Sequence, residues 1–345
     1  MVQYLLTGVT GGLGAHVLEY FLAHVEPSTY AVASSNRAKA DEFTRQGLAF
    51  RVVNYDDPST LDAAFQEVEN LFFVSSNTFD NERRRRQHQD VVDAAKRAGV
   101  KHIWYTSLAF GGHTSTSQVA VQQAHYMTEE MLRVPPPSLM QSSSGIPYTS
   151  IREGLYTEAF PLYFNWYPTT KTIILPQPPT TTTTTQSATT DPAELAHTQR
   201  ITFTSREELG HATARLLLRG GAGYRDQIVV LSARETLSFQ QIVDLINAHH
   251  CQDSRKVGVE FVPAAEYVAR NAADDEGGKA AGFFEAMVSW HEGIAKGEAV
   301  VDSEGLMAEV LGREPTPALV RIEELLRGAK GQGGQGGYVW HQNYA

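Results

Sequence analysis

A glycine-rich turn near the amino terminus constrains the fold of this chain more than any other stretch. An apolar run over 2–6 leads into Thr7-Gly8-Val9-Thr10-Gly11-Gly12-Leu13-Gly14, and an amphipathic stretch over 15–25 follows it. Strand, glycine turn and helix in this order are the context in which such a spacing binds a dinucleotide. The alternative is a tight turn between a strand and a helix that binds nothing.

The glycine positions match the needs of a pyrophosphate site. Missing side chains permit a tight turn, a close approach of the backbone to phosphate, and close packing of helix on strand. The helix that begins near Gly12 directs free N–H groups and the positive end of its dipole toward the phosphates. The sequence therefore predicts that the cofactor is bound by the loop residues Gly8, Thr10, Gly11, Gly12, Leu13 and Gly14.

Apolar runs alternate with helical patterns over the first half of the chain. Strands are expected at 30–33, 50–53, 70–74, 101–105 and 147–151, and helices at about 38–46, 58–68, 81–98 and 119–132. This alternation predicts an α/β fold, a doubly wound Rossmann sheet of parallel strands with helices on both faces. Ligands bind beyond the carboxyl ends of such strands. We therefore expect the cofactor to be bordered by Asn54, Ser75, Ser76, Thr106 and Ser107.

The second half of the chain predicts a small mixed α/β C-terminal domain. Strands are expected at 199–203, 227–231 and 257–262, with helices between and after them. We assign residues 1–155 to the nucleotide-binding domain, to which later strands also contribute, and 156–330 to a smaller substrate-binding region. A threonine- and proline-rich insertion at about 176–192 is expected to be a disordered surface loop, and the glycine-rich residues 331–345 a flexible tail.

The residues after the second strand bear on the choice of cofactor. A site for NAD usually has an acidic residue there to bind the ribose 2′-hydroxyl. This chain has Ser34-Ser35-Asn36-Arg37-Ala38-Lys39 instead. Two cations and no acid favour a 2′-phosphate, so we predict that Arg37 and Lys39 help to bind NADP(H). The alternative is that both side chains are solvated at the start of the next helix.

Composition limits the kinds of partner. The 345 residues carry a formal net charge of −10, which argues against a general nucleic-acid surface. A single cysteine, Cys251, excludes a disulfide framework and suits a reducing compartment. The sequence shows no signal peptide and no apolar run long enough to span a bilayer. We expect a cytoplasmic protein with a small-molecule substrate and with neither nucleic-acid nor membrane contacts. The sequence leaves open whether the chain forms a homo-oligomer.

Three further patterns have weak support. Tyr167 and Lys171 have the Tyr-x-x-x-Lys spacing of short-chain reductases, but Pro168 makes a helix between them unfavourable. The run His249-His250-Cys251 lacks the spacing of a known metal site, and no metal is predicted. The four arginines at 83–86 lie in the first turns of a helix, where a solvated face is expected.

Several segments together carry a family resemblance: 7–14, 38–40, 105–108, 125–132, 145–149, 152–158, 201–218 and 301–326. With them the sequence resembles the NmrA-like group of atypical short-chain dehydrogenases/reductases and, within it, the NADPH-dependent quinone oxidoreductases. The resemblance implies a Rossmann domain and a small C-terminal domain, with the substrate bound between them over the nicotinamide.

Three positions depart from that branch. Ser35 stands where arginine is usual, so Arg37 or Lys39 would have to bind the 2′-phosphate. Asn54 replaces an aspartate and could still bind adenine through its amide. Glu153 replaces an asparagine near the nicotinamide and could act as an acid or base if burial raises its pKa. Alternatively, Glu153 repels an anionic substrate, or is a structural residue paired with Arg152 or a backbone donor.

Two more residues are candidates for the substrate end of the site. A related branch places its catalytic lysine near His125, so this imidazole could donate a proton there near neutral pH. Tyr156 could stack on a flat substrate. The alternatives are a helix-surface histidine with no role in the reaction and a tyrosine that only packs.

The sequence supports two functions of different kinds. The first is an enzyme that transfers hydride from NADPH to a flat conjugated carbonyl compound, a quinone or an enone. The second is a non-catalytic protein of the NmrA type that senses NADP(H) and regulates a partner. His125 and Glu153 favour the enzyme, an argument that rests on groups of the site and not on analogy of fold.

Overall fold

The computed structural model describes residues 1–133, 145–179, 191–250 and 256–331. The threonine run 180–185, the tail 332–345 and Cys251 lie outside these residues, so the expectations of a disordered loop and a flexible tail stay predictions.

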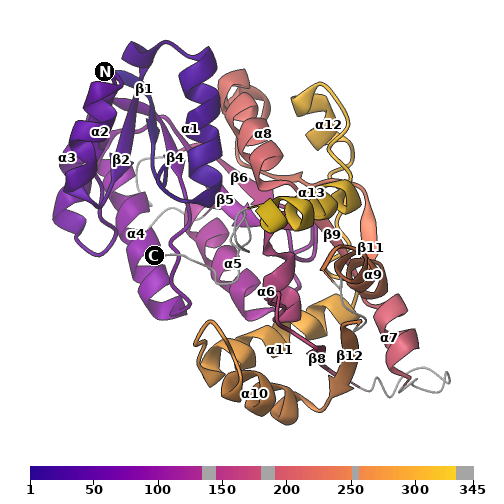
Figure 1. The fold of residues 1–345 in the computed structure, drawn as a ribbon. Coiled ribbons are helices and arrows are strands. Elements are labelled where there is room, and N and C mark those ends of the chain that lie inside the picture. Colours follow the sequence, from indigo (N-terminus) through magenta and orange to yellow (C-terminus); the bar gives the residue numbers. More distant parts are fainter. Residues whose placement is uncertain (134–144, 180–190, 251–255, 332–345) are drawn as a thin grey trace.

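A seven-stranded parallel sheet lies at the centre of the larger of the two parts of the molecule (Figure 1). Its order is β10-β6-β5-β4-β1-β2-β3, and its register pairs Leu5 with Ala31 on one side and with Leu71 on the other. The predicted doubly wound Rossmann sheet is therefore confirmed. The strands of this sheet are β1 (Val2–Leu6), β2 (Tyr30–Ser34), β3 (Ala49–Val52), β4 (Val68–Phe73), β5 (His102–Leu108), β6 (Tyr148–Glu153) and β10 (Gln227–Leu231).

Helices cover both faces of the main sheet, because its strands are apolar on both sides. Phe21 and Leu209 pack with Leu6 on one face, and Val91 and Ile103 belong to the core on the other. The first face carries α1 (Gly12–His24), α2 (Ala40–Arg45), α8 (Arg206–Arg219) and α12 (Leu306–Leu311). The second carries α3 (Leu61–Phe65), α4 (Asn81–Ala98) and α5 (Ala120–Arg133).

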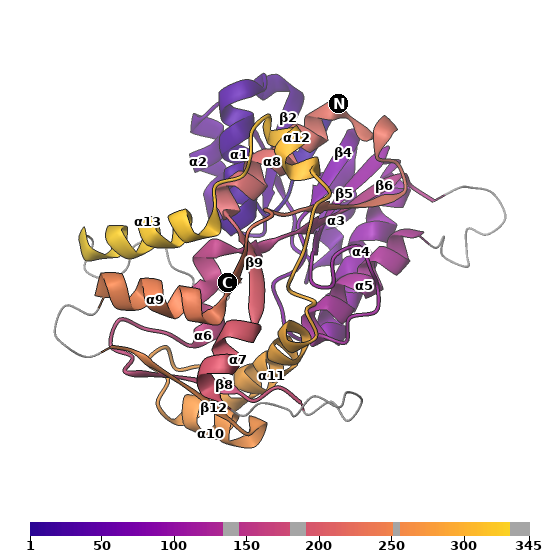
Figure 2. The same cartoon turned by 90° about the vertical axis from the view of Figure 1, so that its right-hand side faces the viewer.

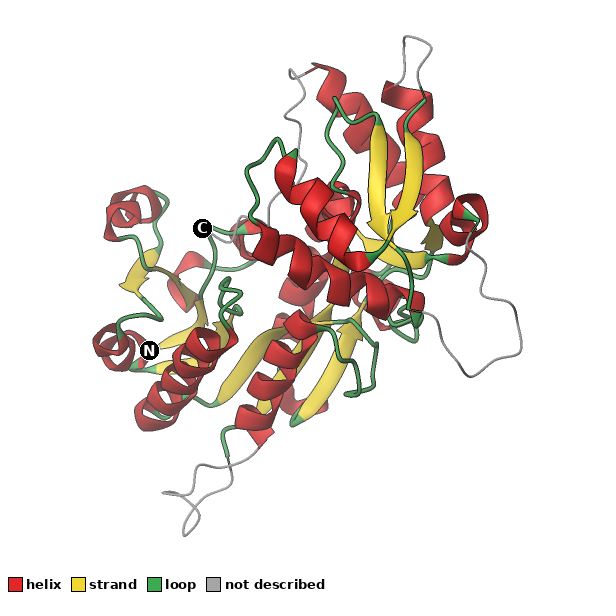
Figure 3. Ribbon diagram, turned by 90° about the horizontal axis from the view of Figure 1, so that it is seen from below, coloured by secondary structure: helices red, strands yellow, loops and turns green. Residues whose placement is uncertain are grey.

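Two small sheets and the remaining helices form the C-terminal part, as expected from the sequence. One sheet has the order β11-β9-β7 and the other pairs β12 with β8, apart from the main sheet (Figure 3). Helices α9 and α13 lie side by side in Figure 2. The strands are β7 (Leu155–Tyr156), β8 (Thr172–Pro176), β9 (Arg200–Thr204), β11 (Thr236–Ser238) and β12 (Gly258–Val262). The helices are α6 (Phe160–Phe164), α7 (Pro192–Thr198), α9 (Phe239–His250), α10 (Ala264–Ala273), α11 (Ala281–Ala295) and α13 (Ala318–Gly331).

The chain passes repeatedly between the two parts. After the small sheet it returns to the main one as β10, and α8 packs against α1. A boundary at residue 155 stays a prediction. Among the described residues, no helix combines the length and apolar character needed to cross a membrane.

Two expected helices are shorter than the sequence suggests. The helix expected at 38–46 begins as a 3-10 turn over Arg37–Lys39, where the Asn36 side chain accepts a hydrogen bond from the Ala38 N–H. The helix expected to reach residue 68 ends at Phe65, because Glu67 adopts a positive φ of 56° and β4 begins at Val68.

Candidate cofactor and substrate site

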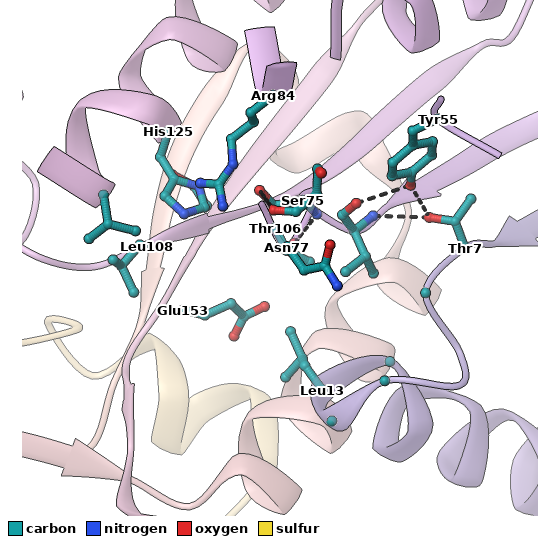
Figure 4. Close-up of a pocket in the computed structure, with 18 of the residues that line it drawn as sticks. Thr7, Leu13, Tyr55, Ser75, Asn77, Arg84, Thr106, Leu108, His125 and Glu153 are labelled. Carbon is teal, nitrogen blue, oxygen red and sulfur yellow. Dashed lines mark hydrogen bonds between the residues drawn. The ribbon is translucent and has the colours of Figure 1, made fainter. Parts of the chain in front are cut away.

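A cavity of about 350 Å³ lies beyond the carboxyl ends of the main-sheet strands (Figure 4). It extends from the turn after β1, past the ends of β2 to β6, to aromatic side chains of the C-terminal part. The structure brings most of the predicted site residues together along this cavity. They are Gly8, Thr10, Gly11, Gly12, Leu13, Gly14, Asn54, Ser75, Ser76, Thr106, Ser107, His125, Glu153 and Tyr156.

The glycine turn has the close backbone contacts that its sequence predicts. Gly8 has a φ of +67°, and a Cβ there would lie 2.6 Å from the Cβ of Val74. A Cβ on Gly14 would lie 2.2 Å from the carbonyl oxygen of Gly8, so α1 starts directly on the turn. Gly11 caps α1 without a side-chain hydrogen bond. The N–H groups of this first turn therefore face the cavity and can bind an anion.

Hydrogen bonds tie the strand ends to one another. The Thr7 hydroxyl donates to the Phe72 carbonyl at 2.8 Å and accepts from the Val74 N–H at 3.0 Å. The Ser75 N–H donates to the Thr106 hydroxyl at 3.0 Å. These contacts hold the ends of β1, β4 and β5 at fixed separations, so the polar edge of the cavity is already formed in the structure.

Arg37 and Lys39 do not lie in this cavity. Ser34 and Ser35 line it at the end of β2, whereas Arg37 is exposed and Lys39 pairs with Glu42 at 2.8 Å. Both side chains belong to the 3-10 turn that follows the end of β2. Their contact with a 2′-phosphate stays a prediction.

Glu153 is buried at the end of β6, with its side chain directed into the cavity (Figure 4). Its Oε1 accepts a hydrogen bond of 2.7 Å from the Thr213 hydroxyl. Its Oε2 is buried without a hydrogen-bond partner among the described residues. Burial is the largest cause that raises the pKa of Glu153 to about 8, while the Thr213 hydrogen bond lowers it. The carboxyl group is therefore mainly protonated at neutral pH.

Arg152 does not neutralise Glu153, although the two are adjacent in sequence. Neighbouring strand residues point to opposite faces of a sheet. Arg152 therefore meets Glu129 of α5, with Nη2 2.7 Å from Oε2. Its Nη1 also donates to the carbonyl oxygens of Gly112 and Thr114 at 2.7 and 2.6 Å. These hydrogen bonds hold the loop after β5, and a pairing of Glu153 with Arg152, one of the alternatives for this residue, is wrong.

His125 is a buried residue of α5 and not a surface histidine. It lines the cavity, and its Nδ1 lies 2.9 Å from the Tyr105 hydroxyl. Burial lowers the pKa of His125 well below the usual value of 6.5, and the charge of Arg84 adds to this effect. The imidazole is therefore neutral at physiological pH. Burial also raises the pKa of Tyr105 to about 12, so its hydroxyl keeps its proton.

The end of the cavity toward the C-terminal part is apolar and aromatic. Tyr163 of α6 and Trp290 of α11 meet edge to face, with ring centroids 5.2 Å apart. Tyr156 of β7 lines the same cavity. Flat apolar surfaces next to two uncharged polar groups are suited to a planar conjugated ligand.

The cavity is also lined by two arginines that were not predicted from the sequence, Arg84 of α4 and Arg206 of α8. Arg83 and Arg85 have half-exposed side chains, but Arg84 is only 5% exposed. The solvated face expected for 83–86 is therefore wrong at Arg84. The helical spacing of Arg84 with the buried Gln87, His88 and Val91 is the signal that could have identified it.

The two competing motifs have other roles. The Tyr167 hydroxyl donates to Asp275 at 2.9 Å and accepts from Lys279, whereas Lys171 is exposed. The Tyr-x-x-x-Lys spacing is therefore coincidental. His249 lies 3.2 Å from Glu323, and the described part of the chain contains no cluster of residues suited to a metal ion.

Comparison with known proteins identifies the family. The sequence profile of the NmrA-like family matches residues 3–312. The chain is also 41% identical over 346 residues to the NmrA-like family domain-containing oxidoreductase flvB of Aspergillus flavus, and the match covers 100% of this chain and 99% of that protein. The chain belongs to the NmrA-like family.

Two solved structures share the fold of this chain. Citrobacter triphenylmethane reductase complexed with NADP(H) superposes with a TM-score of 0.74 at 26% identity, covering 93% of this chain and 99% of the reductase. The NADPH-dependent quinone oxidoreductase QOR2 of Escherichia coli, complexed with NADPH, gives a TM-score of 0.73 at 26% identity over 94% of this chain and 99% of that one. The resemblance inferred from the sequence is confirmed.

Proposed function

We propose that this chain is an NADPH-dependent oxidoreductase that reduces a flat conjugated carbonyl compound, a quinone or an enone. The observation that carries the proposal is that two uncharged groups, His125 and Glu153, line the same cavity as an aromatic wall. The names of the relatives support it, since all three are oxidoreductases or reductases and two are described with NADP(H) bound.

The described residues fit NADP(H). The glycine turn, where a Cβ would collide with backbone at Gly14, offers N–H groups to the pyrophosphate. Asn54 and Ser35 border the adenosine end. Arg37 and Lys39 follow Ser35 by two and four residues and are the cations proposed to bind the 2′-phosphate. Ser75, Ser76, Thr106 and Ser107 border the nicotinamide half. Bound NADPH supplies the hydride, and the protein supplies orientation and a proton.

Glu153 is the proposed proton donor. Oε1 accepts from Thr213, so the proton of the neutral carboxyl group resides on Oε2, which has no other partner among the described residues. When hydride is added to a conjugated carbonyl, negative charge develops on the carbonyl oxygen. A neutral acid with a pKa of about 8 can transfer its proton to that oxygen and recover it from solvent at neutral pH.

His125 is the proposed hydrogen-bond donor to the same oxygen. The Tyr105 hydroxyl keeps its proton and lies 2.9 Å from Nδ1. When this hydroxyl donates a hydrogen bond to Nδ1, the proton of the neutral imidazole resides on Nε2. A neutral imidazole that donates from a fixed position stabilises a developing oxyanion without protonating the substrate first. Tyr105 thus acts as a positioning residue.

The aromatic wall selects the shape of the substrate. Tyr156, Tyr163 and Trp290 can contact a planar ring on its apolar face and edge. The faces of these rings are apolar, so a neutral conjugated molecule loses less hydration against them than a charged one.

The test measures oxidation of NADPH by purified protein against a panel of quinones and enones. We expect turnover with at least one acceptor of each class. His125→Ala and Glu153→Ala should each lower turnover by about 10²- to 10⁴-fold and leave the Kd of NADPH unchanged, because neither residue borders the phosphates. The loss should be larger for an enone than for a quinone, whose reduced anion forms more readily.

Failure to oxidise NADPH with any acceptor in a broad panel would overturn the proposal that this chain is an enzyme. The sensing alternative would then predict a partner or an oligomer whose stability depends on NADPH.

A further inference from the structure

Arg206 is the first residue of α8, and its guanidinium group lies against the glycine turn. If Gly12 carried a Cβ, that atom would lie 2.7 Å from Nη1 of Arg206 and 3.1 Å from its Cδ and Cζ. Arg206 also borders the cavity. The second half of the chain thus places a cation at the nucleotide-binding turn of the first half.

The packing of α8 on α1 explains this placement. The helices are in close contact at Gly210, where a Cβ would lie 2.4 Å from the Cβ of His16 and 3.1 Å from the carbonyl oxygen of Leu13. Arg206 is four residues earlier, so it lies one turn along on the same face of α8. The two helices run side by side in Figure 1, and Arg206 therefore meets the first turn of α1.

The guanidinium group of Arg206 has no carboxylate within ion-pair distance among the described residues. Its Nε is buried without a hydrogen-bond partner in that part of the chain. Glu158 accepts from the Arg206 backbone N–H at 3.0 Å, but its other oxygen lies 3.3 Å from Nε of Arg321. Glu208, in the same turn, pairs with Arg313 at 2.5 Å. The nearby acids are therefore engaged by other groups.

The position is electrostatically unfavourable for a cation without an anion beside it. The amino termini of α1 and α8 each carry the positive end of a helix dipole. The first turn of α1 contains no acidic residue, and the two in the first turn of α8, Glu207 and Glu208, lie 3.9 and 2.5 Å from Arg321 and Arg313. The Arg206 guanidinium group itself faces the Tyr156 ring at 5.9 Å. Partial burial of Arg206 also weakens its hydration. An anionic ligand between the two helix ends would remove this cost.

We propose that Arg206 binds the pyrophosphate of the nucleotide cofactor from its place beside the glycine turn. The inference rests on the proposed cofactor site. A guanidinium group can donate two parallel hydrogen bonds to phosphate oxygens. The pyrophosphate is the favoured partner because it binds at the glycine turn, whereas a 2′-phosphate lies beyond the end of β2, at Ser34 and Ser35.

The test compares the binding of NADP⁺ and NAD⁺ by calorimetry, because the two share the pyrophosphate and differ in the 2′-phosphate. Arg206→Ala should weaken both nucleotides by the same factor, about 10- to 100-fold, and leave their affinity ratio unchanged. Arg206→Lys should recover part of the loss, since it keeps the charge without the fork of donors. Arg219→Ala is the matched control, because it removes an arginine from the other end of α8, where Arg219 pairs with Glu309.

Two results would overturn the proposal. Loss of NADP⁺ affinity alone would show that Arg206 contacts the 2′-phosphate, and unchanged affinity for both nucleotides would show that it contacts neither. Thermal unfolding without nucleotide identifies a variant that fails to fold, and Arg206→Lys then decides the question. If the wild-type protein binds NADP⁺ but reduces no acceptor, the proposed enzymatic function is wrong. The binding test still decides the role of Arg206 in that case.

Discussion

At the scale of single residues, Arg152 and Glu153 are neighbours in sequence but have different surroundings and different roles. The alternation of β6 sends Arg152 to Glu129 on one face and Glu153 to the cavity on the other. A buried cation with a carboxylate partner is a structural group. A buried carboxyl group whose only partner among the described residues is the hydroxyl of Thr213 is a neutral acid near physiological pH.

Replacing Glu153 with glutamine tests this acid. Glu153→Gln keeps the shape and can accept from Thr213, but it has no proton to transfer, so kcat with an enone should fall by about 10²-fold or more. Wild-type kcat should decline as pH rises through about 8, where Glu153 loses its proton. The variant should lack this alkaline decline. A wild-type profile that is flat through pH 9 would contradict the role of Glu153.

The same substitution has a predicted effect on folding. The folded protein holds a proton on Glu153 that the unfolded chain releases near its ordinary pKa of 4.5. The free energy of unfolding should therefore fall as pH rises from about 4.5 to about 8. Urea unfolding at pH 5 and pH 8 should show a smaller fall in Glu153→Gln than in the wild type.

At the scale of elements, the turn between β1 and α1 depends on its glycines to different degrees. A methyl group at Gly14 would lie 2.2 Å from the Gly8 carbonyl oxygen, whereas one at Gly11 would lie 3.4 Å from the same atom. Gly14→Ala should lower the free energy of unfolding by about 1–3 kcal/mol and weaken nucleotide binding, because α1 must shift. Gly11→Ala is the control for folding and should change stability far less. Equal urea midpoints for the two variants would contradict this difference.

The turn after β2 should determine cofactor choice. No acid stands at the end of this strand to bind a ribose 2′-hydroxyl, so NADPH should bind at least about tenfold tighter than NADH. That preference should disappear in Arg37→Ala/Lys39→Ala, and the affinity for NADH should stay unchanged. Fluorescence titration of both nucleotides provides the measurement. Since Lys39 pairs with Glu42 in the structure, a preference for NADPH that depends on Arg37 alone would still agree with the prediction. A preference for NADPH that survives the double substitution would contradict it.

At the scale of the whole molecule, buried neutral histidines should make the protein sensitive to acid. Burial lowers the pKa of His102 and His291 to about 4 and that of His88 and His125 well below 6.5. The unfolded chain binds protons at these groups near pH 6.5, so stability should fall as pH drops from about 6.5 toward 4. The expected slope is up to about 1.4 kcal/mol per pH unit for each histidine.

Urea unfolding at pH 7 and pH 5 measures this sensitivity. His102→Gln and His291→Gln should each lose less stability on acidification than the wild type, even if they are less stable at pH 7. His113→Gln, at a side chain that is 45% exposed, should behave as the wild type does. Identical losses in all four proteins would show that these buried histidines do not account for the acid sensitivity.

The sequence by itself determined the sheet, the glycine turn and the strand ends that border the cavity. These features follow from local patterns: strands that are apolar on both faces, glycines at a fixed spacing, and polar residues at strand termini, which parallel topology brings to one edge. The family resemblance rested on the same patterns. His125 and Glu153 were identified as candidates because they stand where the family places functional groups.

Only the tertiary structure decided the protonation states and the distant contacts. Neutral His125 and protonated Glu153 depend on burial by elements far away in the chain, such as α8 with Thr213. The position of Arg206 depends on the close packing of α8 on α1, two helices separated by 181 residues. Gly210 is buried against Leu13 and His16, and Arg206 lies one helical turn before Gly210. Local sequence patterns carry no information on desolvation or on which distant helix covers a turn, because both arise only when the whole chain packs.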